Sequence, residues 1–138
     1  MNHLVFLDPH AGELEKILSG VKCMLVREFD PAANPVSPGD SLYFLRHKGE
    51  FDLRVAATVV RVLFITNTLD EDLSHTLKEL QPRLQLTEEQ YNTWISKAQV
   101  VLVEFERAHK IDIIHVDAHK ITDREGWLAF KDFSLITG

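Results

Sequence analysis

Residues 51–65 place the strongest constraint on the fold, because this long segment is rich in valine and its apolar and polar side chains alternate in the first half. Alternation with a period of two predicts a strand that buries one face. The apolar stretch 41–45 precedes it, and the turn-forming residues 47–50 separate the two, so together they predict a hairpin. We expect a β-sheet in which residues 51–65 form the central strand.

The rest of the chain adds further strands and a first helix. Apolar and β-branched stretches predict strands at residues 3–7, 22–28 and 100–105, and weaker ones at 111–116 and 127–133. A helix is expected to begin after Asp8, with Asp8 as its N-cap and Pro9 in its first position. It should end near Ser19, because Gly20 can adopt the left-handed conformation that ends many helices.

Residues 69–97 have apolar side chains three or four positions apart up to Pro82, and a capping-box sequence then begins at Thr87. They predict two short helices. The order of elements indicates an α+β domain whose mixed, largely antiparallel, barrel-like sheet is flanked by short helices. Since 138 residues is the length of one domain, we expect residues 1–138 to form a single domain.

Composition excludes several classes of protein. With 45% hydrophobic and 26% charged residues, the chain has the balance of a soluble globular protein. No apolar run approaches the roughly 18 residues needed to span a bilayer, and the first residues lack the features of a signal peptide, so we expect a cytoplasmic protein with no membrane partner. The single cysteine, Cys23, can form neither an internal disulfide nor a multi-thiolate zinc site.

The formal net charge of -6 excludes a broad electrostatic grip on a nucleic-acid backbone. Any contact with nucleic acid must therefore be local. Residues 16–61 hold a small basic excess in an otherwise acidic chain, and this segment contains Lys22, Arg27 and Arg46. It is the part of the sequence in which we expect a binding site for an anionic or polar ligand.

Three short motifs occur in a fixed order: ILSGVKCMLVR at residues 17–27, PGD at 38–40 and VLVEF at 101–105. Together they resemble the ASCH family of the PUA-like superfamily, over about residues 14–106. The resemblance implies a β-barrel with helices beside it, a cleft between them, and a role linked to RNA or to nucleosides.

Physical reading of the first motif gives candidate roles to its residues. Gly20 lets the backbone turn, Lys22 offers an ammonium to a phosphate or acyl oxygen, and the planar fork of Arg27 can hold a phosphate or a base edge. Side chains alternate along a strand, so Lys22 and Arg27 share a cleft only if Lys22 precedes the regular strand or a bulge intervenes. The alternative is that both are solvated charges at the edge of the sheet.

Three further residues complete the predicted binding site. Arg46 is expected to border the cleft with the other two cations, Tyr43 to offer a surface on which a base can stack, and Glu104 to line the cleft from the late strand. Each of two residues has an alternative interpretation. Tyr43 can be a packing residue, and Glu104 can be an exposed carboxylate opposite basic neighbours.

One ASCH branch consists of amidohydrolases that remove an N-acyl group from a modified cytidine. In that branch a threonine three residues after the lysine acts with the lysine and a glutamate. The corresponding residue here is Leu25, which can neither attack a carbonyl nor donate to an oxyanion. The glutamate falls in the helical segment, where Glu79, Glu88 and Glu89 are equally placed candidates.

The sequence indicates no catalytic residue, no cofactor and no metal site. His115, Asp117 and His119 alternate, but along an extended chain they span roughly 13 Å, too far to meet one ion. The leading hypothesis is therefore a domain that binds RNA or a nucleotide-like small molecule in a basic cleft. The alternative is an amidohydrolase that acts on a small N-acylated nucleoside such as N4-acetylcytidine.

Overall fold

The computed structural model describes residues 1–29, 36–47, 49–68, 73–121 and 127–138. Its strands are β1 (Asn2–Phe6), β2 (Met24–Glu28), β3 (Ser41–Leu45), β4 (Asp52–Thr66), β5 (Gln99–His115) and β6 (Trp127–Phe130). Its α-helices are α1 (Glu13–Leu18), α2 (Leu73–Glu79), α3 (Gln81–Leu84) and α4 (Glu88–Ile95), and two 3-10 helices, η1 (Ala118–Lys120) and η2 (Phe133–Leu135), lie near the C-terminus.

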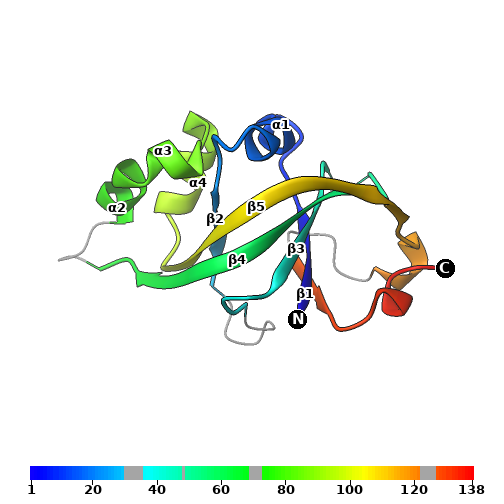
Figure 1. Ribbon diagram of the computed structural model, residues 1–138. Helices are drawn as coiled ribbons and strands as arrows, with labels where there is room; N and C mark the ends of the chain where they lie inside the picture. The colour runs from blue at the N-terminus through cyan, green and yellow to red at the C-terminus, as the bar shows by residue number, and fades with distance from the viewer. Residues whose placement is uncertain (30–35, 48, 69–72, 122–126) are drawn as a thin grey trace.

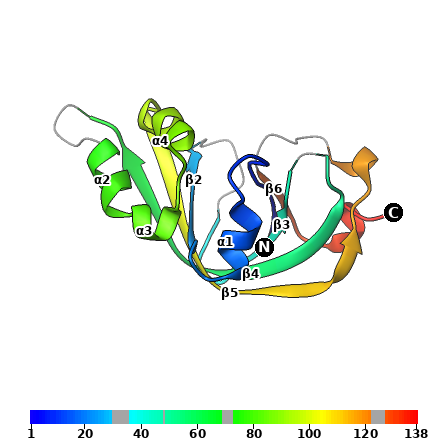
Figure 2. The same cartoon turned by 90° about the horizontal axis from the view of Figure 1, so that it is seen from above.

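All six strands form one sheet in the order β2-β5-β4-β3-β1-β6. Strands β1 and β3 are parallel and the other neighbours are antiparallel, so the sheet is mixed and largely antiparallel. Figures 1 and 2 show it curled like part of a barrel, with α2, α3 and α4 at one end of the long β4–β5 ribbon and the C-terminal segment at the other. The predicted α+β class and barrel-like sheet are confirmed.

The curl has a local cause in the pairing of β4 with β5. The register of these strands shifts between Leu53 and Val55, between Ala56 and Thr58, and between Val59 and Arg61. A bulge bends its strand and increases the local twist, and three in one ribbon bend it strongly. The predicted strands at residues 100–105 and 111–116 both fall in the single strand β5, except for Val116, which follows it. Strand β5 continues across the intervening polar residues because β4 pairs with it along its length.

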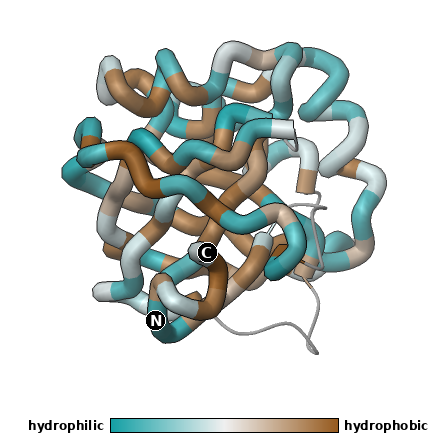
Figure 3. Tube along the Cα trace, turned by 90° about the vertical axis from the view of Figure 1, so that its right-hand side faces the viewer, coloured by the Kyte–Doolittle hydropathy of each residue, from teal (hydrophilic) through white to brown (hydrophobic). Residues whose placement is uncertain are grey.

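Alternating side chains fill different hydrophobic clusters on the two faces of the sheet. Leu25 of β2 joins the cluster that packs against α1, whereas Met24 and Val26 face the cluster beneath α2, α3 and α4. Both clusters combine apolar side chains of the strands with those of the helices packed on them, and in Figure 3 hydrophobic segments run through the middle of the trace. The sheet thus has helices packed on it, and the region where their clusters meet at β2 holds the site described below.

The described part of the helical segment, residues 73–97, contains three helices, whereas two were predicted for residues 69–97. Pro82 lies in the first turn of α3, a position where its missing N–H costs no hydrogen bond, so proline begins a helix here as well as interrupting one. The predicted capping box is confirmed: the Thr87 side chain accepts from the Gln90 backbone N–H, and the Gln90 side chain accepts from the Thr87 N–H. In the described part of the chain, no helix has both the length and the apolar character required to cross a membrane.

Helix α1 begins later than predicted. Its N-cap is Gly12, with a left-handed backbone (φ 60°), and Asp8 lies outside the helix. The Asp8 carboxylate instead accepts from the backbone N–H of His10, and the Asp8 N–H donates to the Glu13 carboxylate at 2.8 Å. These local bonds compete with the capping bond that the sequence suggested. The predicted end is confirmed, since Gly20 follows the helix with φ 81°.

Candidate functional site

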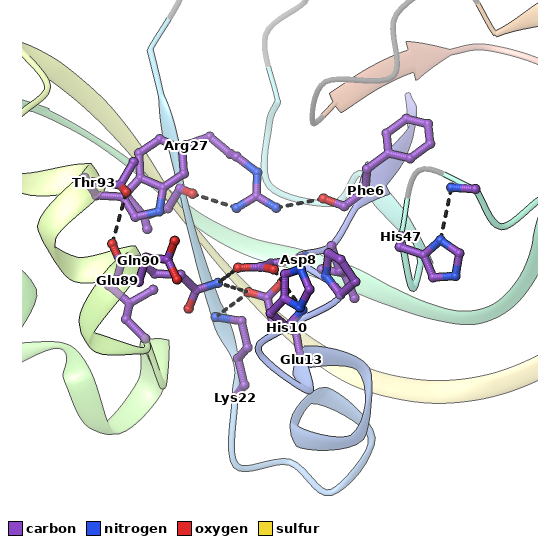
Figure 4. Close-up of a pocket in the computed structure, with 16 residues that line it drawn as sticks. Phe6, Asp8, His10, Glu13, Lys22, Arg27, His47, Glu89, Gln90 and Thr93 are labelled. Carbon is purple, nitrogen blue, oxygen red and sulfur yellow. Dashed lines mark hydrogen bonds and ion pairs between the residues drawn. The ribbon is translucent and has the colours of Figure 1, made fainter.

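A cleft of about 740 Å³ opens where the edge strand β2 faces the end of β1. Its lining comes from the end of β1 and the loop after it, from α1, from the segment before β2 and the middle of that strand, from the turn after β3 and from α4. Lys22 and Arg27 both belong to the lining (Figure 4). Strand β2 begins only at Met24, so Lys22 precedes the regular strand and is free of its alternation.

The Lys22 side chain is almost completely buried, with a relative exposure of 1%. Its ammonium donates to the backbone carbonyl of Leu84 in α3 and lies 3.6 Å from a carboxylate oxygen of Glu13, which is also buried. Burial lowers the pKa of Lys22 to about 8; Glu13 opposes this shift, and the nearby cations Arg27 and Lys16 add to it. Lys22 is therefore an ammonium that loses its proton at a lower pH than an exposed lysine does.

Arg27 joins two strands that are not hydrogen-bonded neighbours in the sheet. One guanidinium nitrogen donates to the carbonyl of Val26 at 2.7 Å and another to the carbonyl of Phe6, at the end of β1, at 3.2 Å. Burial lowers the pKa of Arg27 while Glu13 and Asp8 raise it, and a guanidinium keeps its charge in proteins. With five N–H donors, Arg27 retains donors for a ligand beyond these two bonds.

Two carboxylates and an amide occupy the centre of the site. The side-chain nitrogen of Gln90 donates to Asp8 at 3.3 Å and to Glu13 at 3.4 Å. Figure 4 shows the Gln90 side chain facing both carboxylates, with the Lys22 ammonium below it and Arg27 above. A continuous polar network thus connects α4, the loop after β1, α1 and the segment before β2.

The charge of the lining is mixed. Asp8, Glu13 and Glu89 contribute carboxylates, against the cations of Lys22 and Arg27. Trp94 adds an aromatic side chain that is partly buried against the hydrophobic cluster under the helices. Cations, carboxylates and an aromatic ring in one hollow suit a ligand that has hydrogen-bond donors and acceptors on a flat ring.

The structure places the other four predicted site residues apart from Lys22 and Arg27. Among the lining residues that it describes, none is Gly20, Tyr43, Arg46 or Glu104. Gly20 serves the turn after α1. Arg46 lines an adjoining hollow, which shares His47 and Gly49 with the cleft, and its backbone N–H donates to Glu50.

Tyr43 and Glu104 have structural contacts. The Tyr43 ring packs edge-on against Phe133, with 5.0 Å between ring centroids. Glu104 forms ion pairs with Arg61 at 3.4 Å and Arg83 at 3.0 Å. These contacts correspond to the alternatives that the sequence left open, a packing aromatic and a carboxylate opposing basic neighbours.

The structure also places the residues that the sequence analysis weighed for catalysis and for metal binding. Leu25 is fully buried in the cluster against α1, so no nucleophile stands at the position of the family threonine. Of the three candidate glutamates, Glu89 lines the cleft. His115 forms a hydrogen bond with Asp52 at 2.5 Å, and in the described ranges no three His, Cys, Asp or Glu side chains are arranged to hold a metal ion.

Sequence reasoning missed Asp8, Glu13 and Gln90 as site residues. Asp8 and Gln90 were assigned helix-capping roles, and Glu13 is an ordinary acidic residue in the first turn of α1. Gln90 both caps α4 and takes part in the site, because its oxygen accepts from the Thr87 N–H while its nitrogen donates to Asp8. The capping box was the one available signal, since it fixes the orientation of the Gln90 side chain.

No protein-family model matches the chain, and no curated protein matches it. Solved structures do match. The crystal structure of ZmASCH from Zymomonas mobilis aligns with a TM-score of 0.70 and 12% identity over 94% of this chain and 87% of that one. Two single-residue mutants of ZmASCH align at TM-scores of 0.71 and 0.72, with 12% and 13% identity, over 96% of this chain and 91% and 89% of theirs. The chain therefore has the fold of ASCH-domain proteins, which its short sequence motifs resemble.

Proposed function

We propose that the cleft binds a nucleoside-like ligand, either a free nucleoside or nucleotide or an unpaired base of RNA. The observation that carries this proposal is that Lys22 and Arg27, five positions apart in the sequence, line one hollow. Its volume of about 740 Å³ falls within the range of small-molecule sites, roughly 300–1,000 Å³. The fold likeness to ASCH-domain proteins is consistent with this class of ligand.

The charges favour a single base over a long stretch of backbone. A groove that tracks nucleic acid is positive along its length, whereas this cleft has three carboxylates beside its two cations. Base edges need both donors and acceptors, and here Arg27 supplies donors and Asp8 an acceptor. Trp94 supplies a ring face, and stacking contributes roughly 1–3 kcal/mol per base.

Isothermal titration calorimetry of the four ribonucleosides, their 5′-monophosphates and a short single-stranded RNA tests the proposal. We expect binding by at least one nucleoside, and Arg27→Gln to weaken it roughly tenfold by removing charge-assisted donors. Arg61→Gln is the matched control, because it removes the same charge from an exposed position outside the cleft. Thermal unfolding of each variant confirms that it is folded.

Absence of binding by every ligand in the panel, or equal loss in both arginine variants, would refute the proposal. A preference for RNA over its component nucleosides would identify RNA as the source of the base. N4-acetylcytidine belongs in the same panel. If the protein releases free cytidine from it, the chain is an amidohydrolase, and the binding proposal is replaced by that alternative. Binding without release would support the proposal as stated.

A further inference from the structure

The Gln90 side chain makes contacts on three sides of the cleft. Its oxygen accepts from the backbone N–H of Thr87 at 3.0 Å, which completes the cap of α4. Its nitrogen donates to Asp8 and Glu13, residues 82 and 77 positions away in the sequence. One amide therefore connects the start of α4 to the loop after β1 and to α1.

These contacts determine which way the amide points. Rotating it by half a turn would direct its oxygen at two carboxylates and its nitrogen at an N–H donor, leaving every contact repulsive. The capping box holds the oxygen toward Thr87, so the NH2 group must face Asp8 and Glu13. The two acidic side chains share one neutral donor, which offsets part of their mutual repulsion.

Lys22 is the next member of the network. Its ammonium lies 3.6 Å from the same Glu13 oxygen to which Gln90 donates. The groups that act on this ammonium are Glu13 and Lys16 of α1, Arg27 of β2 and the Leu84 carbonyl of α3. Of these charged groups, Glu13 alone attracts it, so a residue that fixes the place and charge of Glu13 also controls Lys22.

We propose that Gln90 is a positioning residue, whose amide holds the Asp8 and Glu13 carboxylates together and thereby controls the electrostatic surroundings of Lys22. Helix capping is then the smaller part of its role. The effect on Lys22 requires no ligand; only the effect on ligand affinity rests on the proposed function.

Gln90→Glu separates the two roles. Glutamate is an ordinary capping-box residue, so the Thr87 N–H keeps its acceptor. The NH2 group is replaced by a charged oxygen beside Asp8 and Glu13, and the added negative charge favours the protonated form of Lys22. We expect the pKa of Lys22, followed by NMR of its side-chain nitrogen, to rise by about one unit.

Gln99→Glu is the matched control, because it makes the same chemical change at an exposed residue at the start of β5. Thr87→Ala is the complementary variant: it removes the hydroxyl that accepts from the Gln90 N–H and leaves the Gln90 amide in place. We expect both controls to leave the pKa of Lys22 unchanged, while Thr87→Ala lowers the melting temperature. Gln90→Met, with similar length and no donor, serves if Gln90→Glu fails to fold; it releases the Glu13 carboxylate without adding charge, so it should lower the pKa of Lys22.

The inference is overturned if the folded Gln90 variant leaves the pKa of Lys22 at its wild-type value, or if Gln99→Glu raises it equally. Where a nucleoside binds, Gln90→Glu should weaken binding roughly tenfold and Gln99→Glu should not. Failure of every nucleoside to bind, together with the Lys22 shift in Gln90→Glu, would refute the proposed function and uphold the role of Gln90.

Discussion

Lys22 is a charged residue held in the interior by two contacts, the Leu84 carbonyl and the Glu13 carboxylate. Burying an ammonium costs free energy that such contacts offset only in part, which is why its pKa falls to about 8. Lys22 has this unfavourable burial at a position that lines the cleft. At the scale of single residues, the site therefore contains a buried charge that protein stability alone would not favour.

The lowered pKa of Lys22 predicts how stability varies with pH. Between about pH 8 and 10.5 the unfolded chain binds the proton that the folded chain releases, so the free energy of unfolding rises with pH across this window. The rise contributed by Lys22 is on the order of 3 kcal/mol. Urea unfolding from pH 7.5 to 10.5 should show it in the wild type and not in Lys22→Met.

Lys131→Met, at an exposed position, is the control for that experiment and should follow the wild-type curve. Parallel curves for the wild type and Lys22→Met would contradict the prediction.

His3 predicts a dependence of the same sign at acid pH, since its pKa is also lowered in the folded chain. Its ring is fully buried, with one nitrogen 2.8 Å from Asp40 and the other accepting from the Trp127 indole at 2.9 Å. Burial lowers its pKa below 6.5, although Asp40 opposes the shift. The unfolded chain therefore binds a proton first as the pH falls, and stability decreases below about pH 6.5. Protonation also removes the acceptor for Trp127.

Urea unfolding at pH 7 and pH 5, followed by tryptophan fluorescence, checks this prediction. The wild type should lose more stability between the two values than His3→Gln does. His75→Gln changes an exposed histidine and should behave like the wild type. An equal loss in the wild type and His3→Gln would show that another group is responsible.

At the scale of elements, β2 is an edge strand that contacts β1 through a side chain. The sheet order separates β2 from β1, and the Arg27 guanidinium spans the opening between them by donating to Phe6. Helix α4 stands over this opening and contributes Gln90 and Trp94 to its lining. The cleft thus exists because the curled sheet does not close by hydrogen bonding at this point.

Arg27→Lys tests the contribution of this bridge to stability. A lysine has one nitrogen and cannot donate to the Val26 and Phe6 carbonyls with the fixed geometry of a guanidinium. We expect a loss of about 1–2 kcal/mol in the free energy of unfolding, measured with urea. Arg61→Lys, at an exposed ion pair with Glu104, should change it by less than about 0.5 kcal/mol.

At the scale of the whole molecule, the net charge of -6 and the three carboxylates of the cleft oppose a salt-dependent mode of binding. The two cations of the cleft already have partners in the protein: Lys22 is buried beside the Glu13 carboxylate, and Arg27 donates to the Phe6 carbonyl. A ligand is then recognised by short-range hydrogen bonds and stacking, which salt screens little.

The expected outcome is a nucleoside affinity that changes by less than about twofold between 50 and 500 mM NaCl. A protein that neutralises several phosphates loses affinity by orders of magnitude over a comparable range. Titration calorimetry at three salt concentrations measures this dependence. A steep decrease would point to contacts with phosphates instead.

The local elements were predictable because neighbours in the sequence determine them. Pro38 and Gly39, two residues typical of turns, form one in which the Asp40 N–H donates to the Ser37 carbonyl and Gly39 has a φ of 93°. Strand β3 has the predicted bounds, and β4 differs from its predicted bounds by one residue at each end. The capping box at Thr87 was also predicted from the sequence and is present in the structure.

The sequence by itself determined the strands, the end of α1, the capped start of α4 and the presence of two cations in one short segment, since periodicity and turn chemistry act over a few residues. Only the tertiary structure decided that Lys22 is buried against Glu13 and that Gln90 meets Asp8 across 82 positions. It also decided that Tyr43, Arg46 and Glu104 lie elsewhere. Such contacts depend on how the sheet curls and where the helices pack, and this is a property of the whole chain that no local pattern contains.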